Sequence, residues 1–87
     1  MDPRRKRIVF RAWRRGFLEI DLILGKFADE HVDKLNDAEL AEFERLLDAP
    51  DADVYGWIVA AEPPPAAWAG ALMARLRALH GPEGAPL

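Results

Sequence analysis

The sequence contains no cysteine, no serine and no threonine. Without cysteine, the chain forms no disulfide and offers neither a thiolate ligand for zinc nor a thiol nucleophile. Without serine and threonine, it lacks the hydroxyl nucleophiles on which many hydrolases depend. No apolar run approaches the ~20 residues that a helix needs to cross a bilayer. These absences exclude several classes of enzyme and predict a chain that does not enter a membrane.

The common signatures of metal and cofactor sites are missing as well. Neither His31 nor His80 has a second ligand at the spacing of an H-x-x-x-H pair. The chain has no G-x-G-x-x-G or G-x-x-x-x-G-K loop to hold phosphate groups. Carboxylates are plentiful, but no pair of them stands in an apolar context. We therefore expect no metal and no resident cofactor, and we expect that the chain is not an enzyme.

Charge is distributed unevenly along the chain. The net charge is −3, yet residues 1–15 carry +6 and residues 16–87 carry −9. An arginine-rich N-terminus is typical of mitochondrial presequences. Here the segment has no serine and continues directly into a helical pattern, so we expect it to be part of the fold. No secretory signal precedes it, and the location expected on this basis is the cytoplasm.

Apolar residues recur at spacings of three and four and nowhere alternate for long, which predicts an all-α protein. We expect a small compact five-helix bundle, with one domain over residues 1–80 and a flexible tail over residues 81–87. The first helix should span residues 3–15 and the second residues 17–32. The residues expected to face the core are Ile8, Val9, Ala12, Trp13, Phe17, Ile20, Ile23, Leu24, Phe27, Ala28, Leu40, Phe43, Leu46, Leu47, Val54, Trp57, Ile58, Ala61, Trp68, Leu72, Leu76 and Leu79.

Capping signals predict where the later helices begin. Asn36 and Glu39 form a capping-box pattern at the start of the third helix, which Pro50 should end. Asp51 or Asp53 should then cap the fourth helix. The last residue of the triple proline, Pro65, suits the first turn of the fifth.

Two leucines do not fit the main apolar face of the second helix. Leu18 and Leu22 lie to one side of it, so either they meet a second packing partner or they are exposed contact residues. We expect a monomer, because no heptad seam requires self-association. Exposure of both leucines would make a dimer through this helix an alternative.

The segment Arg15-Gly16-Phe17-Leu18-Glu19 joins the first two helices. Glycine commonly ends a helix because it reaches positive φ, and arginines in a last turn complement the helix dipole. Glu19 would fall in the first turn of the second helix, where an acid is favourable and should point to solvent. A plain junction between two helices therefore accounts for these residue types without any function.

The same segment resembles the R-G-x-x-E motif of the small succinate dehydrogenase assembly factors. The resemblance continues in order over residues 4–62. It comprises Arg14-Arg15-Gly16 and Glu19-Ile20-Asp21, Leu24 and Phe27-Ala28, Glu42-Phe43-Glu44-x-Leu46-Leu47, and Asp51-x-Asp53-Val54 with Trp57-Ile58. Phe17 stands where many members carry methionine.

This resemblance implies a five-helix assembly factor, or chaperone, that binds the flavoprotein subunit of succinate dehydrogenase, and often that of fumarate reductase. Such a factor promotes the covalent attachment of FAD to its client. A histidine of the client forms the bond to the flavin. FAD is therefore carried by the client flavoprotein, and the factor is expected to hold no cofactor.

The resemblance also implies which residues bind the partner: Arg15, Gly16, Phe17, Glu19 and Asp21. Arg11 joins them as a member of the basic stripe on the first helix, which fits an acidic client surface. Gly16 would allow close approach of a partner backbone, and the planar fork of Arg15 would suit a carboxylate or carbonyl groups of the client. Glu19 would accept hydrogen bonds from the client or organise Arg15. Asp21 would either share this surface or bridge to an arginine of the first helix.

Nucleic-acid binding is the main alternative. The arginines at positions 4, 7, 11, 14 and 15 form a stripe that could neutralise phosphates. The second helix would then be the recognition helix, but it exposes Glu19, Asp29 and Glu30, which would repel DNA. We therefore expect a protein client and no nucleic acid. Composition alone also allows a purely structural adaptor.

Overall fold

The computed structural model describes residues 1–80, and the tail expected over residues 81–87 lies outside the described residues. Residues 1–80 form helices and no strand, which confirms the all-α, five-helix prediction. The helices are α1 (Pro3–Ala12), α2 (Leu18–His31), α3 (Asp37–Asp48), α4 (Asp51–Val59) and α5 (Ala71–His80), with the 3-10 turns η1 (Val32–Lys34) and η2 (Ala66–Trp68). No helix in this part of the chain has the length and apolar character to cross a membrane.

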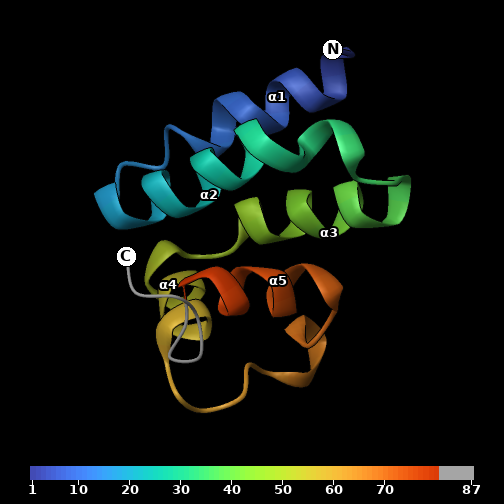
Figure 1. Ribbon diagram of the computed structural model, residues 1–87. Coiled ribbons are helices and arrows are strands. Elements are labelled where there is room, and N and C mark those ends of the chain that lie inside the picture. The colour runs from blue at the N-terminus through green and yellow to red at the C-terminus, as the bar shows by residue number, and fades with distance from the viewer. Residues whose placement is uncertain (81–87) are drawn as a thin grey trace.

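The helices stack in three levels (Figure 1). α1 and α2 run side by side in opposite directions, α3 lies beneath them, and α5 lies on the other side of α3 together with α4. α4 also contacts α2. The turn between α1 and α2 therefore lies at the same end of the molecule as the turn between α3 and α4, which brings residues about 35 positions apart in sequence into contact.

The core lies where the apolar spacing predicts it. Most of the predicted positions are buried, and the largest fully buried side chains include Phe27 and Phe43, whose rings pack 5.8 Å apart. Burying each side chain of this size contributes about 1.5 to 3 kcal/mol. Two predictions are wrong: Leu79 is 44% exposed, and Ala61 is exposed beyond the end of α4. Met73 faces the core from α5 in place of Leu79.

The third helix begins with the predicted capping box. The Asn36 side chain accepts a hydrogen bond from the backbone N–H of Glu39, and the Glu39 carboxylate accepts one from the N–H of Asn36, both at 2.9 Å. α1 has a cap that the sequence analysis did not anticipate, since the carboxylate of Asp2 accepts the N–H of Arg5 at 2.9 Å. Both caps satisfy amide groups that a first turn leaves unpaired.

Three predicted helix ends need correction. α1 ends at Ala12 rather than at residue 15, because the chain already turns at Trp13 to reach α2. Pro50 occupies the cap position of α4, so neither Asp51 nor Asp53 caps this helix. Both acids instead lie in its first turn. Pro65 precedes the η2 turn, and α5 begins only at Ala71.

The tryptophans pack at the edge of the core. Trp57 and Trp68 pack against it as predicted, and their rings stack with centroids 5.0 Å apart. Trp13 lies directly on Gly25 of α2, and its indole N–H donates to the carboxylate of Asp29 at 3.2 Å. Gly25 is therefore a position where the absence of a side chain lets α1 approach α2.

Replacing Gly25 with alanine should destabilise the fold. A Cβ at this position would overlap the indole carbons Cδ2, Cε2 and Cε3 of Trp13, and a rigid ring cannot yield easily. Such overpacking should lower the free energy of unfolding by about 1 to 3 kcal/mol, measured by urea titration with circular dichroism.

Gly56 provides the matched control within α4. A Cβ there meets nothing within 4 Å, so Gly56→Ala should raise the free energy of unfolding by about 0.5 to 1 kcal/mol through helix propensity. Equal stabilisation by the two substitutions would contradict the close packing of Trp13 on Gly25.

Candidate functional site

The turn between α1 and α2 is built around Gly16. Its φ is +83°, and it is the one residue with positive φ in the described part of the chain. The positive φ that the sequence predicts is confirmed, and other residues reach this region only at a cost of roughly 1 to 2 kcal/mol. Gly16 does not terminate the first helix, however, because α1 already ends at Ala12 and Gly16 lies further along, inside the turn. A Cβ on Gly16 would meet no atom of the chain within 4 Å, so the space above the turn is open.

Asp21 holds this turn against the start of α2. Its Oδ1 accepts a hydrogen bond from the backbone N–H of Arg15 at 2.9 Å. Of the two roles expected for Asp21, the structure thus shows a bridge to the region of the first helix, but the donor is backbone and not an arginine side chain. The bond fixes the direction in which α2 leaves the turn.

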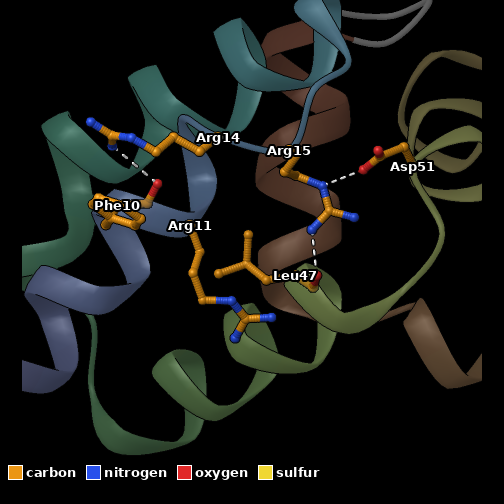
Figure 2. A pocket seen from close by; sticks show the side chains of 6 residues that line it. All are labelled: Phe10, Arg11, Arg14, Arg15, Leu47 and Asp51. Atoms are coloured by element: carbon orange, nitrogen blue, oxygen red, sulfur yellow. Dashed lines mark hydrogen bonds and ion pairs between the residues drawn. The ribbon is translucent and has the colours of Figure 1, made fainter.

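The side chain of Arg15 points into the molecule, as Figure 2 shows, and is 9% exposed. Its Nε–H donates to the carboxylate of Asp51, and its Nη1–H and Nη2–H donate to the carbonyl oxygens of Leu47 and Ala49. These carbonyls end α3 and would otherwise lack partners. Asp51 begins α4. One guanidinium therefore connects the motif turn to the α3–α4 junction.

This geometry gives Arg15 a structural role that the sequence analysis did not anticipate. Arg15 was expected to offer its fork to a client, whereas here the three donating nitrogens bind acceptors of the same chain. The alternative that Glu19 organises Arg15 is not seen, since within residues 1–80 Arg15 pairs with Asp51 instead. A direct contact between Arg15 and a partner stays a prediction.

The other half of the motif faces outward. Glu19 is exposed, as predicted, and its carboxylate has no hydrogen bond or ion pair within residues 1–80. Leu18 and Leu22 are 69% and 40% exposed, which decides the question that the sequence left open. Phe17 is half-buried, and its ring lies 5.4 Å from that of Tyr55 in α4.

Much of the arginine stripe is used to hold α1 on its neighbours. Arg4 pairs with Glu44 at 2.7 Å, and this hydrogen bond holds the pKa of the Glu44 carboxyl below its ordinary value. Arg5, which stands beside the stripe and not in it, also holds α1 in place by donating to the carbonyl oxygens of Val32 and Leu35 at 2.9 and 2.7 Å. Arg11 pairs with Asp48 of α3 at 2.5 Å. Because these groups already have partners, the stripe is a poorer surface for phosphates than the sequence suggested.

A polar pocket of about 320 Å³ lies between α1, α3 and the start of α4. Its lining consists of Phe10, Arg11, Arg14, Arg15, Leu47 and Asp51 (Figure 2). The guanidinium of Arg14 lies 3.9 Å from the centre of the Phe10 ring and donates to the Phe10 carbonyl at 3.5 Å. Of the predicted site residues, this pocket contains Arg11 and Arg15.

A second pocket contains Glu19 and lies between α2, α4 and the end of α5. The predicted site residues therefore lie on two faces of the molecule. Arg11 and Arg15 line the first pocket, and Glu19 lines the second. Gly16 lies in the turn that joins the two faces, and Phe17 packs against Tyr55. Tyr55 and Asp51 were missed as contributors to this region. Only the D-x-D-hydrophobic pattern before Trp57 hinted that α4 takes part. Among residues 1–80, no group of three or more potential metal ligands comes together.

Comparison with known proteins agrees with the family resemblance of the motif that this site contains. The family described as "Flavinator of succinate dehydrogenase" matches residues 6–80. Among curated relatives, proteins named "Succinate dehydrogenase assembly factor 2, mitochondrial" occur in Mycosarcoma maydis, Meyerozyma guilliermondii and Cryptococcus neoformans. The Mycosarcoma maydis protein is 48% identical over 63 residues, or 72% of this chain. The Meyerozyma guilliermondii protein is 45% identical over 56 residues, or 64% of this chain. The Cryptococcus neoformans protein is 41% identical over 66 residues, or 76% of this chain. The matches cover 26%, 42% and 38% of those relatives' own lengths, so the chain spans less than half of each.

The names of these relatives contradict the cytoplasmic location expected above. Each is called mitochondrial, which points to the mitochondrion rather than the cytoplasm. The lack of a secretory signal before the basic segment, on which the expectation rested, does not distinguish these two compartments. The basic N-terminal segment belongs to the fold, as expected, since it forms α1.

Replacing Arg15 with lysine should destabilise the protein although the charge is kept. An ammonium group cannot reach all three acceptors that lie in the plane of the guanidinium, so at least one of the two carbonyl groups and the Asp51 carboxylate loses its donor. The free energy of unfolding should fall by about 2 kcal/mol, measured by urea titration.

Arg11→Lys is the control for this substitution. Arg11 is 43% exposed and makes a single ion pair with Asp48, so its replacement should cost at most about 0.5 kcal/mol. If the two lysine variants were equally stable, Arg15 would not have the connecting role that its contacts indicate.

Proposed function

We propose, since this chain belongs to the family described as the flavinator of succinate dehydrogenase, that it binds the flavoprotein subunit of that enzyme and promotes the covalent attachment of FAD to it. The observation that supports this proposal best is the exposed first turn of α2. There Glu19 has no partner within the described chain, and Leu18 beside it is 69% exposed. A carboxylate next to exposed apolar surface is well suited to contact another protein.

The turn that carries this surface is held rigidly. The Asp21 carboxylate binds the backbone of Arg15, and the Arg15 side chain binds both ends of the α3–α4 junction. The backbone that carries Glu19 is therefore held in place, which lowers the entropy lost when a partner binds. Gly16 leaves open space above the turn, where a partner backbone can approach.

In this proposal the chain acts without catalysing a reaction itself. The flavoprotein holds FAD and supplies the side chain that becomes bonded to it, and the factor holds its client in an arrangement that favours that bond. The flavoprotein of fumarate reductase is a second client of the same kind. The lack of cysteine, serine and threonine nucleophiles agrees with a non-catalytic role.

The test is covalent flavin on the denatured flavoprotein subunit, measured by in-gel fluorescence in cells that lack the factor. The cells are supplied with the wild type, Glu19→Ala or Asp33→Ala. Asp33 is an exposed acid in η1, at the opposite end of α2 from the motif. The wild type and Asp33→Ala should restore the fluorescence, whereas Glu19→Ala should reduce it by about tenfold.

Glu19→Ala removes no hydrogen bond or ion pair within the described chain. The lost favourable charge in the first turn of α2 is largely offset by the higher helix propensity of alanine, so circular dichroism and melting temperature should lie close to those of the wild type. A loss of flavin attachment is then a loss of interaction and not of folding. Normal fluorescence in cells without the factor would reject the proposed function. Full rescue by Glu19→Ala would reject the role of this surface.

A further inference from the structure

The pocket that contains Glu19 has mainly apolar walls. Leu22 and Ile23 line it from α2, and Tyr55 and Val59 line it from α4. We call it the α2–α4 pocket; its volume is about 320 Å³. Pockets for small molecules occupy roughly 300 to 1,000 Å³, so this one lies at the lower limit. Its exposed wall surface is mainly apolar, and the polar groups of Glu19, Lys26, Tyr55 and His80 also line it.

The charged groups of the α2–α4 pocket have opposite signs. Glu19 and Lys26 both line it from α2, seven positions apart, which corresponds to roughly 10 Å along a helix axis. Both side chains are exposed, and neither has an ion pair within residues 1–80. A group bound in the pocket therefore has a carboxylate on one side and an ammonium group on the other, both carried by α2.

His80 completes the lining from the end of α5. Burial of its imidazole lowers the pKa of His80 below its ordinary value, so the ring is neutral near pH 7. Its Nδ1 is buried and has no hydrogen-bond partner among the described residues. With His80 neutral, Lys26 is the one cation that lines the pocket. A ligand with several phosphate groups would need more positive charge than this.

The pocket continues onto the surface proposed for the partner. Leu22 is 40% exposed at its edge, and Leu18, one turn earlier, is 69% exposed. Glu19 belongs both to the pocket and to the exposed first turn of α2. A protein that covers the motif therefore also covers the pocket entrance. Protein interfaces concentrate their binding energy where a large apolar side chain fills such a pocket.

We propose that the α2–α4 pocket receives one large apolar side chain of the flavoprotein partner. The segment that carries this side chain has an acidic group facing Lys26 and a basic group facing Glu19. This inference rests on the proposed function and specifies how the partner is bound. The apolar side chain supplies affinity, and the two charges set the direction in which the segment crosses α2.

The test is the dissociation constant of the complex between the purified flavoprotein subunit and variants of this protein, measured by isothermal titration calorimetry. Leu22→Asp places a charge at the pocket edge, and Leu79→Asp is its control on α5, where the leucine is 44% exposed and does not line the pocket. Leu22→Asp should weaken binding by about tenfold or more, and Leu79→Asp by less than about twofold.

Two further variants test the size and the charge of the site. Val59→Phe fills part of the pocket without adding charge and should also weaken binding by about tenfold. Lys26→Glu should weaken binding by about fivefold, whereas Lys34→Glu in η1 should have little effect. Circular dichroism of every variant shows whether its fold is intact, and Leu22→Asp keeps the test valid if Val59→Phe unfolds.

The outcomes separate this inference from the proposed function. If the wild type binds the flavoprotein but Leu22→Asp and Lys26→Glu bind equally well, the pocket assignment is overturned and the proposed function stands. If the wild type does not bind at all, both fail. If the wild type forms a dimer that Leu22→Asp dissociates, the occupant is a second copy of the chain and the assignment is likewise overturned.

Discussion

The fold around the motif depends on the guanidinium of Arg15. It lies in the turn between α1 and α2, yet its acceptors are the last carbonyl groups of α3 and the first acid of α4. Two segments that are distant in sequence, the motif turn and the α3–α4 junction, are therefore joined by one planar group whose donors match the spacing of the acceptors. Because α2 begins directly after this turn, the same contacts position α2 relative to α4. The pocket between those helices follows from this arrangement.

The motif consequently serves two purposes in one short segment. Arg15 and Asp21 face the molecule and fix the turn, while Glu19 faces solvent without a partner in the described chain. A substitution at Arg15 and a substitution at Glu19 should thus both reduce partner binding, but for different reasons. Only the first should also lower stability. The resemblance implied that Arg15 contacts the client directly, and it left open whether Glu19 does so or organises Arg15.

Features set by residues close in sequence could be predicted. The apolar spacing gave the all-α class and most of the core, and the capping box between Asn36 and Glu39 appears as expected. Features set by contacts between residues distant in sequence could not be predicted. The acceptors of Arg15 lie 32 to 36 positions away, and no local pattern identifies them. Leu79 shows the same limit, because its spacing suits a core position although the side chain is 44% exposed in the last turn of α5.

The most direct test of this division is hydrogen–deuterium exchange of the protein alone and bound to the flavoprotein subunit. We expect binding to protect the backbone amides at the start of α2 and around Tyr55 to Val59 in α4, which surround Glu19 and the pocket. The backbone amides of α1 should exchange at the same rate in both states. Protection confined to α1 and its arginine stripe, with none at the start of α2, would contradict the account.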